Sequence, residues 1–164
     1  MGGMTFTPTG KTFHWRALGL LDALSNRLGH KPNAAIASHL AIGLRGEEIA
    51  FFHLRELGYI LIARRWKTPK FPGDVDLIGW DTDTLCFIEV KTRTGRTIVP
   101  AEFSVDQHKQ KTLRSLASVF LKHFPETLRR HIPVRFDVVS VYLPVAGTNA
   151  EVEIEVLQAA FSRH

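Results

Sequence analysis

The chain has 164 residues, of which 45% are hydrophobic, and this supplies enough apolar side chains for one compact domain of ordinary size. Its 21 Lys and Arg against 16 Asp and Glu give a formal net charge of +5, which favours a polyanionic partner such as nucleic acid. The single cysteine, Cys86, excludes an internal disulfide, and no apolar run approaches the roughly 18 residues of a membrane span. We therefore expect a soluble, cytoplasmic protein without a membrane partner.

Residues 1–40 are expected to form an N-terminal extension that is partly helical or disordered. Leucines recur in it at helical spacing, at Leu18, Leu21, Leu24 and Leu28. An organellar presequence or a membrane-surface helix would show this pattern, but we favour a short helix that packs on the domain or on a second copy of the chain. Residues 41–164 are expected to form the functional domain.

The first half of this domain is predicted to be one helix followed by three strands. Apolar residues at helical spacing predict a helix over 33–57, and Gly58 follows where a C-terminal cap is expected. Runs of aliphatic and aromatic residues predict strands over 59–66, 74–80 and 85–93. Two prolines and a glycine predict an irregular, mobile loop over 67–73. The run 81–84 is typical of a hairpin turn, so the second and third strands should pair antiparallel.

The second half is predicted to be a helix followed by two strands. An apolar side and a basic side predict an amphipathic helix over 105–124, with Ser104 or Asp106 as its N-terminal cap. Strands are predicted over 134–143 and 151–157, with a turn between them. The order of elements indicates an α/β domain with a mixed central sheet flanked by helices.

Glu89-Val90-Lys91, in the third predicted strand, is the most informative pattern. Because side chains alternate between the faces of a strand, Glu89 and Lys91 project to one side and Val90 to the other. Two charges in an apolar strand are unfavourable unless they are paired or bind something charged. Asp76, in the preceding strand, comes close to Glu89 if the two strands are hairpin neighbours.

A divalent metal would offset the repulsion between Asp76 and Glu89. Carboxylate oxygens with room for water suit Mg²⁺ or Mn²⁺. Such a metal lowers the pKa of water and stabilises charge on a phosphate, while Lys91 could orient the nucleophile or stabilise the transition state. Glu47, near the middle of the first predicted helix, could complete the ligand set or hold a metal-bound water if that helix packs across the strand ends. The pattern therefore predicts a phosphodiester hydrolysis site with Asp76, Glu89 and Glu47 as metal ligands.

Each of these residues has a simpler explanation when it is considered alone. A Glu-x-Lys pair usually lies on a solvated strand face, an Asp near a turn usually forms the turn, and a Glu on a helix usually lies at the surface. The combination favours function, because Glu47, Asp76, Glu89 and Lys91 follow one another on a helix and two strands, before a basic helix.

Candidate nucleic-acid contacts are the basic side chains Arg93, Lys109, Lys111 and Arg114. Cations spaced along a helix can follow a phosphate backbone. A solvated helix surface explains the same spacing equally well.

Five motifs along the chain carry a resemblance to a known family. They are Leu44-Arg-Gly-Glu-Glu-Ile-Ala50, Gly58-Tyr-Ile-Leu-Ile-Ala-Arg-Arg-Trp66, Gly73-Asp-Val-Asp-Leu-Ile78, Phe87-Ile-Glu-Val-Lys-Thr-Arg93 and Arg135-Phe-Asp-Val-Val139. Together they resemble the YraN-like family of uncharacterised bacterial proteins, which is similar to the PD-(D/E)xK restriction-endonuclease and Holliday-junction-resolvase superfamily. The resemblance covers residues 44–143 and implies a restriction-endonuclease-like αβββαβ core.

The resemblance also implies roles for individual residues. The superfamily's helix glutamate falls on Glu47, its metal aspartate on Asp76, and its glutamate and lysine on Glu89 and Lys91. Lys109 falls on a basic position of the second helix that could touch the scissile region or the backbone. One departure is Asp74, which stands where the family usually has a glutamate.

These observations lead to two main functional hypotheses and to a weaker third, in which the protein is an assembly partner whose N-terminal leucines mediate dimerisation. The first is a Mg²⁺-dependent endonuclease (or one that uses Mn²⁺) that hydrolyses phosphodiester bonds in DNA, with branched or structured DNA among the candidate substrates. The alternative is a non-catalytic nucleic-acid-binding protein with a nuclease-like fold. A homodimer would allow two-fold symmetric cutting.

Overall fold

The computed structural model describes residues 34–95 and 105–163. The predicted leucine-rich helix and the candidate cap Ser104 lie outside these residues. The described elements are α2 (Ala34–Glu56), β1 (Ile60–Thr68), β2 (Phe71–Asp81), β3 (Thr84–Thr94), α3 (Gln107–Phe120), the 3-10 turn η3 (Leu121–His123), α4 (Glu126–Arg129), β4 (Val134–Leu143) and β5 (Glu153–Phe161).

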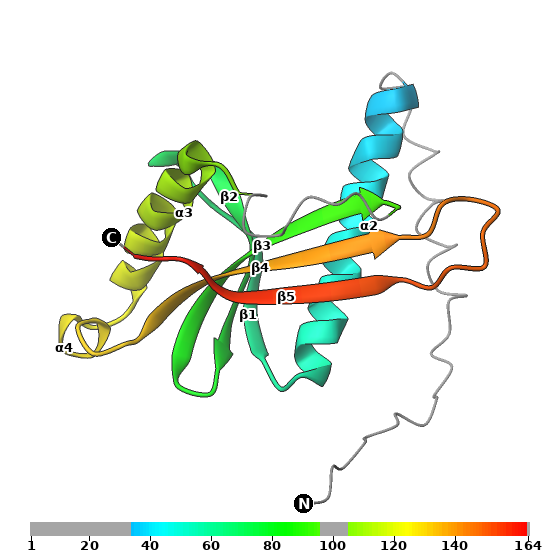
Figure 1. The fold of residues 1–164 in the computed structure, drawn as a ribbon. Helices are drawn as coiled ribbons and strands as arrows, with labels where there is room; N and C mark the ends of the chain where they lie inside the picture. The colour runs from blue at the N-terminus through cyan, green and yellow to red at the C-terminus, as the bar shows by residue number, and fades with distance from the viewer. Residues whose placement is uncertain (1–33, 96–104, 164) are drawn as a thin grey trace, which may run out of the picture. The chain divides into compact units, whose positions relative to one another are not determined.

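The strands form one mixed sheet in the order β1-β2-β3-β4-β5 (Figure 1). The pairs β1/β2, β2/β3 and β4/β5 are antiparallel, whereas β3 and β4 are parallel. A parallel pair needs a crossover connection, and α3 lies in that connection. The predicted antiparallel pairing of the second and third strands is confirmed.

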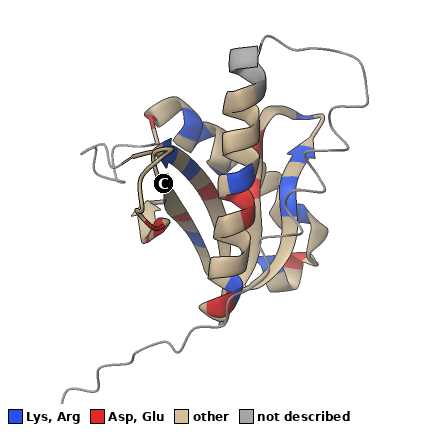
Figure 2. Ribbon diagram, turned by 90° about the vertical axis from the view of Figure 1, so that its right-hand side faces the viewer, with Lys and Arg blue, Asp and Glu red and all other residues tan. Residues whose placement is uncertain are grey.

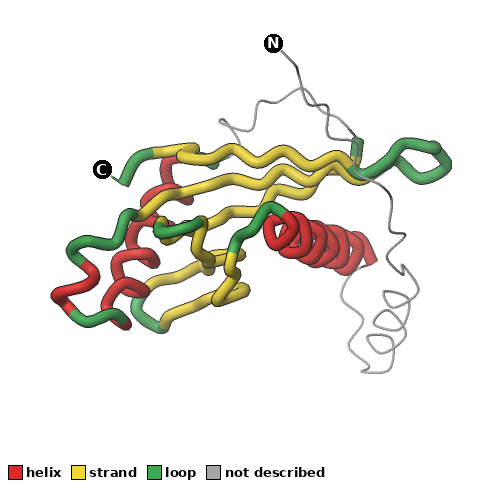
Figure 3. The backbone as a smooth tube through the Cα atoms, turned by 90° about the horizontal axis from the view of Figure 1, so that it is seen from below, coloured by secondary structure: helices red, strands yellow, loops and turns green. Residues whose placement is uncertain are grey.

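The two long helices pack on opposite faces of the sheet (Figure 3). Alternate residues of β3 separate the two cores, because Phe87 packs in the cluster that contains α3, while Cys86 and Ile88 pack in the cluster that contains α2. The predicted α/β class, with a mixed sheet flanked by helices, is therefore confirmed. Within the described part of the chain, no helix is both long and apolar enough to cross a membrane.

The prediction of an irregular loop over 67–73 is wrong. β1 continues to Thr68 and β2 already begins at Phe71, so Pro69 and Lys70 form a tight turn between them. Pro72 is tolerated because β2 pairs with β3 only from Leu77 onward, and a missing N–H before that point removes no bond of that ladder.

The other element boundaries shift by a few residues. The cap of α3 is Asp106, whose Oδ1 accepts the backbone N–H of Lys109 at 2.8 Å. The helix ends at Phe120 and continues as η3, and the short α4 was not predicted. β5 runs to Phe161, beyond the predicted end at residue 157.

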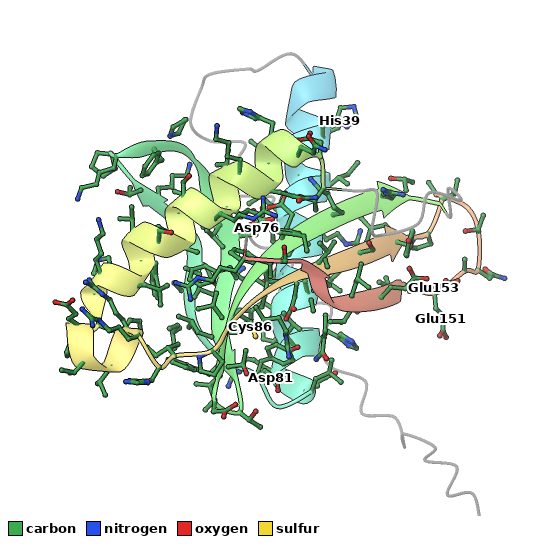
Figure 4. The ribbon with its side chains drawn as sticks, turned by 60° about the vertical axis from the view of Figure 1, so that its left-hand side comes forward. His39, Asp76, Asp81, Cys86, Glu151 and Glu153 are labelled. Carbon is green, nitrogen blue, oxygen red and sulfur yellow. The ribbon has the colours of Figure 1, made fainter. Side chains whose placement is uncertain are left out.

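Arg135 organises a polar cluster at the other end of the sheet from Asp76, where Figure 4 labels Cys86 and Asp81. Its Nε donates to Asp137 Oδ1 at 2.8 Å, and an NH2 group donates to Asp81 Oδ2 at 2.7 Å and to the hydroxyl of Tyr59 at 2.8 Å. The backbone N–H of Ala159 also donates to Asp137 Oδ1, at 3.0 Å. The Arg135 motif therefore joins β4 to β2 and β5, which is a structural role.

Candidate active site

Asp76 lies where β2 and β3 begin to diverge. The last paired residues of the two strands are Leu77 and Ile88. Beyond them, Asp76 Oδ2 accepts the backbone N–H of Val90 at 2.7 Å, so a side chain replaces the next contact between the strands. The divergence leaves the Asp76 carboxylate (labelled in Figure 4) between two strand backbones, close to the middle of β3.

Glu89 is held by two ammonium groups. Its side chain is 4% exposed, Lys91 Nζ lies 3.0 Å from Oε1, and Lys109 Nζ lies 2.9 Å from Oε2. Oε2 is fully buried, and the ammonium of Lys109 is its charged partner. Each carboxylate oxygen of Glu89 therefore faces an ammonium group of the protein itself.

Asp76 is destabilised in its charged form. Burial raises the pKa of Asp76 to about 7, and the negative charge of Glu89 adds to this rise. The Val90 N–H and the charge of Lys109 oppose the rise without cancelling it. The two carboxylates thus repel each other inside the protein, which is the electrostatic situation that a bound cation relieves.

Lys109 extends from α3 into the same cluster. Burial lowers its pKa, but the charges of Glu89, Asp76 and Asp74 outweigh burial and give a net rise. Its ammonium also lies 3.4 Å from the backbone oxygen of Asp74. Asp74 itself pairs with Lys67 at 3.7 Å and is more exposed than Glu89.

Glu47 approaches this cluster from α2, where acidic residues lie in the middle of the helix (Figure 2). Its side chain is 14% exposed and lies 3.1 Å from Arg65 Nε. Burial raises the pKa of Glu47 above its ordinary value, while Arg65 lowers it and the charges of Asp74 and Glu89 raise it. Glu47 therefore belongs to the same electrostatic cluster, although an arginine is its nearest partner.

Two backbone features set the position of Glu47. A Cβ on the neighbouring Gly46 would lie 1.8 Å from Thr92 Oγ1, so α2 approaches β3 as closely as only glycine permits. Arg65 has a positive φ of 49°, a left-handed conformation that a side chain such as arginine rarely adopts. Backbone strain of this kind is concentrated at functional sites.

The donor atoms in this cluster suit a hard divalent cation. Carboxylate oxygens are the ligands that Mg²⁺ and Mn²⁺ prefer. Among the described residues, however, no three His, Cys, Asp or Glu side chains are gathered closely enough to enclose a metal. The ammonium of Lys109 takes up the cation position beside Glu89, so a metal would bind there only after Lys109 moves aside.

The structure thus brings Asp76, Glu89 and Lys91 together on the sheet face that α3 covers, with Lys109 among them. The basic residues farther along α3 are arranged differently. Arg114 Nε donates to the backbone oxygen of Ser162 at 2.9 Å, and its guanidinium lies over the ring of Phe161, so Arg114 anchors the end of β5. Lys111 is exposed and Arg93 is half-buried; their contacts to nucleic acid remain predictions.

Ser140 is a buried polar residue beside Lys91 that the sequence analysis did not identify. It pairs with Lys91 between the parallel strands β3 and β4, and its fully buried Oγ has no hydrogen-bond partner among the described residues. The only sequence signal is a single hydroxyl inside the apolar run Val138-Val-Ser-Val141. Arg65 was likewise missed, because no pattern predicted that it would pair with Glu47.

An α/β core of this topology, with acidic and lysine side chains at the point where β2 and β3 diverge, has the architecture of the restriction-endonuclease-like fold. The model of the Uncharacterised protein family UPF0102 matches residues 46–141, and the chain belongs to this family. The resemblance to the YraN-like family is confirmed.

Three relatives illustrate the similarity. A UPF0102 protein of Koribacter versatilis (strain Ellin345) is 42% identical over 151 residues, which cover 92% of this chain and 96% of the relative. A UPF0102 protein of Solibacter usitatus (strain Ellin6076) is 37% identical over 73% of this chain and 84% of its own length. A UPF0102 protein of Rhodococcus opacus (strain B4) is 39% identical over 77% of this chain and its own full length.

Proposed function

We propose that the protein is a Mg²⁺-dependent endonuclease that hydrolyses phosphodiester bonds in DNA. The observation that carries the proposal is the pair of buried carboxylates, Asp76 and Glu89, with the ammonium of Lys91 3.0 Å from Glu89 Oε1. Both ammonium groups, from Lys91 and Lys109, pair with Glu89, so a purely structural ion-pair cluster gains nothing from the buried Asp76, whose charge is unfavourable beside Glu89. A site for a divalent cation and a phosphate accounts for both carboxylates.

Asp76 and Glu89 would hold the metal, and Glu47 would support it from α2. When bound, a divalent cation stabilises negative charge on a phosphodiester and lowers the pKa of a water molecule. Asp76 would keep its place through the Val90 N–H, which fixes the carboxylate relative to the backbone of β3. Glu47 would be held in turn by Arg65.

Lys91 would act on the reacting phosphate. Its side chain is 33% exposed, whereas that of Glu89 is 4% exposed, so the ammonium can reach a solvent-side ligand while it stays paired with Glu89. In that position it would orient the attacking water or stabilise the negative charge that develops on the phosphate oxygens. Lys91 is therefore the proposed catalytic lysine.

The test is cleavage of labelled single-stranded, duplex, flapped and four-way DNA with Mg²⁺ or Mn²⁺. Wild type should cut at least one of these substrates, and Asp76→Asn and Lys91→Ala should both abolish cutting. Asp83→Asn, at an exposed hairpin turn, is the matched control and should cut like wild type. Cleavage that persists in Asp76→Asn would refute the assignment.

A second candidate is a nucleic-acid-binding protein that has this fold without catalysis. The observation that favours it is that both oxygens of Glu89 already face the protein's own ammonium groups, from Lys91 and Lys109. In that case DNA binding should depend on salt but not on Mg²⁺, and no substrate should be cut.

A further inference from the structure

Four basic side chains converge on a surface pocket outside the candidate active site, and none of them is among the predicted nucleic-acid contacts. A surface pocket of about 280 Å³ is lined by Ser118, Leu121, Lys122, Arg129, Arg130 and Arg163. Its four basic side chains come from three separate parts of the chain: the α3–η3 end, α4, and the segment after β5. Cations brought together from distant parts of the sequence repel one another and are stabilised when an anion binds between them.

The pocket keeps its positive character despite one acidic neighbour. Glu126 pairs with Arg130 and lies 3.8 Å from Arg129, so it offsets part of the charge of these two arginines. The Arg130 side chain remains 70% exposed, and no acidic residue lines the pocket itself. Exposed guanidinium groups suit phosphate, because the planar group can donate two parallel hydrogen bonds to phosphate oxygens.

The basic surface continues toward the β1–β2 turn. A second pocket, of about 360 Å³, shares Lys122 with the first and adds Lys67 from the end of β1 and Lys70 from that turn. Lys67 pairs with Asp74, whose backbone oxygen lies beside Lys109, so this surface leads back to the candidate active site. A chain of cations with this extent matches a polymer of phosphates better than a single small anion.

We propose that the Lys122–Arg129–Arg130–Arg163 pocket binds the DNA backbone at a distance from the cleaved bond. The proposal rests on the proposed action on DNA and adds a second phosphate-binding site to it. α4 lies beyond the C-terminal end of α3, away from the end that carries Lys109 (Figure 1). The helical rise between Lys109 and Lys122 separates the two sites by roughly 20 Å, which corresponds to about six base pairs of duplex.

The experiment measures DNA binding without divalent metal, so that it is independent of cleavage. Fluorescence anisotropy with the full chain compares Arg130→Ala/Arg163→Ala with wild type over a range of salt concentrations. The control Arg45→Ala/Arg55→Ala removes the same charge from exposed positions of α2, on the opposite face of the sheet. On a duplex of about 20 base pairs, the pocket variant should bind roughly tenfold more weakly, and its salt slope should fall by about two, because each lost phosphate contact removes about one.

Two further arms make the result specific. Arg130→Lys/Arg163→Lys keeps the charge and should retain most of the affinity, which separates loss of charge from loss of folding. On a DNA hairpin whose stem of about three base pairs spans only half of this separation, the pocket variant and wild type should differ less. Equal affinity of the pocket variant and wild type for the long duplex would overturn the proposal. It would also be overturned if the pocket variant lost binding only to anionic phospholipid vesicles and kept its affinity for DNA.

The outcome is distinguishable from failure of the nuclease assignment. If wild type cuts no DNA but the pocket variant still loses affinity, the pocket binds DNA and the nuclease proposal fails. If wild type cuts DNA and the pocket variant binds and cuts normally, the nuclease proposal stands and the pocket does not contact the backbone.

Discussion

The ammonium of Lys109 lies 2.9 Å from Glu89 Oε2, where it neutralises a buried carboxylate that Asp76 repels. A lysine of α3 thus supplies the positive charge that this carboxylate oxygen faces. Because a metal and this ammonium would compete for the same oxygen, Lys109 should weaken metal binding and stabilise the metal-free fold.

Replacement of Lys109 by methionine tests this competition. Mn²⁺ titrated into Lys109→Met by calorimetry should bind about tenfold more tightly than to wild type, which corresponds to about 1.4 kcal/mol. In the absence of metal, the variant should unfold with a free energy roughly 1–3 kcal/mol lower, because a buried charge has lost a partner. Lys111→Met removes an exposed lysine two positions farther along α3. It should change neither the Mn²⁺ affinity nor the free energy of unfolding. Weaker Mn²⁺ binding to Lys109→Met would show instead that Lys109 supports the metal site.

Asp76 should make the stability of the protein depend on pH. Its pKa is about 7 in the folded protein, chiefly because of burial and then because of Glu89, against an ordinary value of 3.8. Between these two values the folded state binds more protons at Asp76 than the unfolded state, so the free energy of unfolding falls as the pH rises from about 4 to about 7. The loss should be on the order of 4 kcal/mol and should level off above pH 7.

Thermal unfolding at pH 5 and pH 8 measures this effect. Wild type should be more stable at pH 5, and Asp76→Asn should lose most of the difference because asparagine does not titrate. Mg²⁺ should stabilise wild type at pH 8 far more than at pH 5, where protons compete with the metal. A wild-type protein more stable at pH 8 than at pH 5 in the absence of metal would contradict the raised pKa.

The two glycines of α2 provide a matched pair. A Cβ at Gly46 would lie 1.8 Å from Thr92 Oγ1, whereas a Cβ at Gly43 has no neighbour within 4 Å. Gly46→Ala should therefore lower the free energy of unfolding by roughly 1–3 kcal/mol through overpacking. Gly43→Ala should raise it by about 0.5–1 kcal/mol, because alanine favours the helix.

Chemical denaturation of both variants and of Gly46→Ala/Thr92→Ala tests the pair. The double variant should recover part of the lost stability, because it lacks the Thr92 hydroxyl and methyl groups that a Cβ at position 46 would contact. Gly46→Ala should also weaken Mn²⁺ binding, since it pushes Glu47 away from Asp76 and Glu89. Equal stability of the two single variants would mean that α2 does not approach β3 this closely.

The sequence predicted the parts of this molecule that follow from local periodicity. Alternation along β3 correctly indicated that Glu89 and Lys91 share a face, and hairpin chemistry at 81–84 correctly indicated the pairing that brings Asp76 near Glu89. The cap at Asp106 was predictable because capping depends on residues only a few positions apart.

Contacts between distant segments could not be predicted in this way. Nothing local indicates that Arg65 would take a left-handed backbone conformation and pair with Glu47, or that Arg114 would anchor Ser162. The prolines in 67–73 were misleading, because their effect depends on whether a neighbouring strand needs the missing N–H, and that is decided by the register of β2 and β3.

Asp137 allows a structural acid to be distinguished from the acids of the candidate active site. It lies in one of the motifs that resemble the family, but its partners are Arg135 and the backbone N–H of Ala159. Its side chain is fully buried, and it receives Arg135 and the Ala159 N–H. Asp137→Asn should lower the free energy of unfolding by about 3 kcal/mol, since Arg135 loses one of its buried partners. Asp83→Asn should stay within about 0.5 kcal/mol of wild type.

Urea denaturation checks the stability of Asp137→Asn, and Mn²⁺ titration at low temperature, where the variant is folded, checks the candidate site. Metal affinity should equal that of wild type, because Asp137 holds Arg135, which binds Asp81 at the opposite end of β2 from Asp76. If Asp137→Asn had normal stability but no longer bound metal, Asp137 would be part of the metal site and not a structural residue. That result would also require β4 to shift, since Asp137 packs on the sheet face covered by α2 whereas Glu89 faces α3.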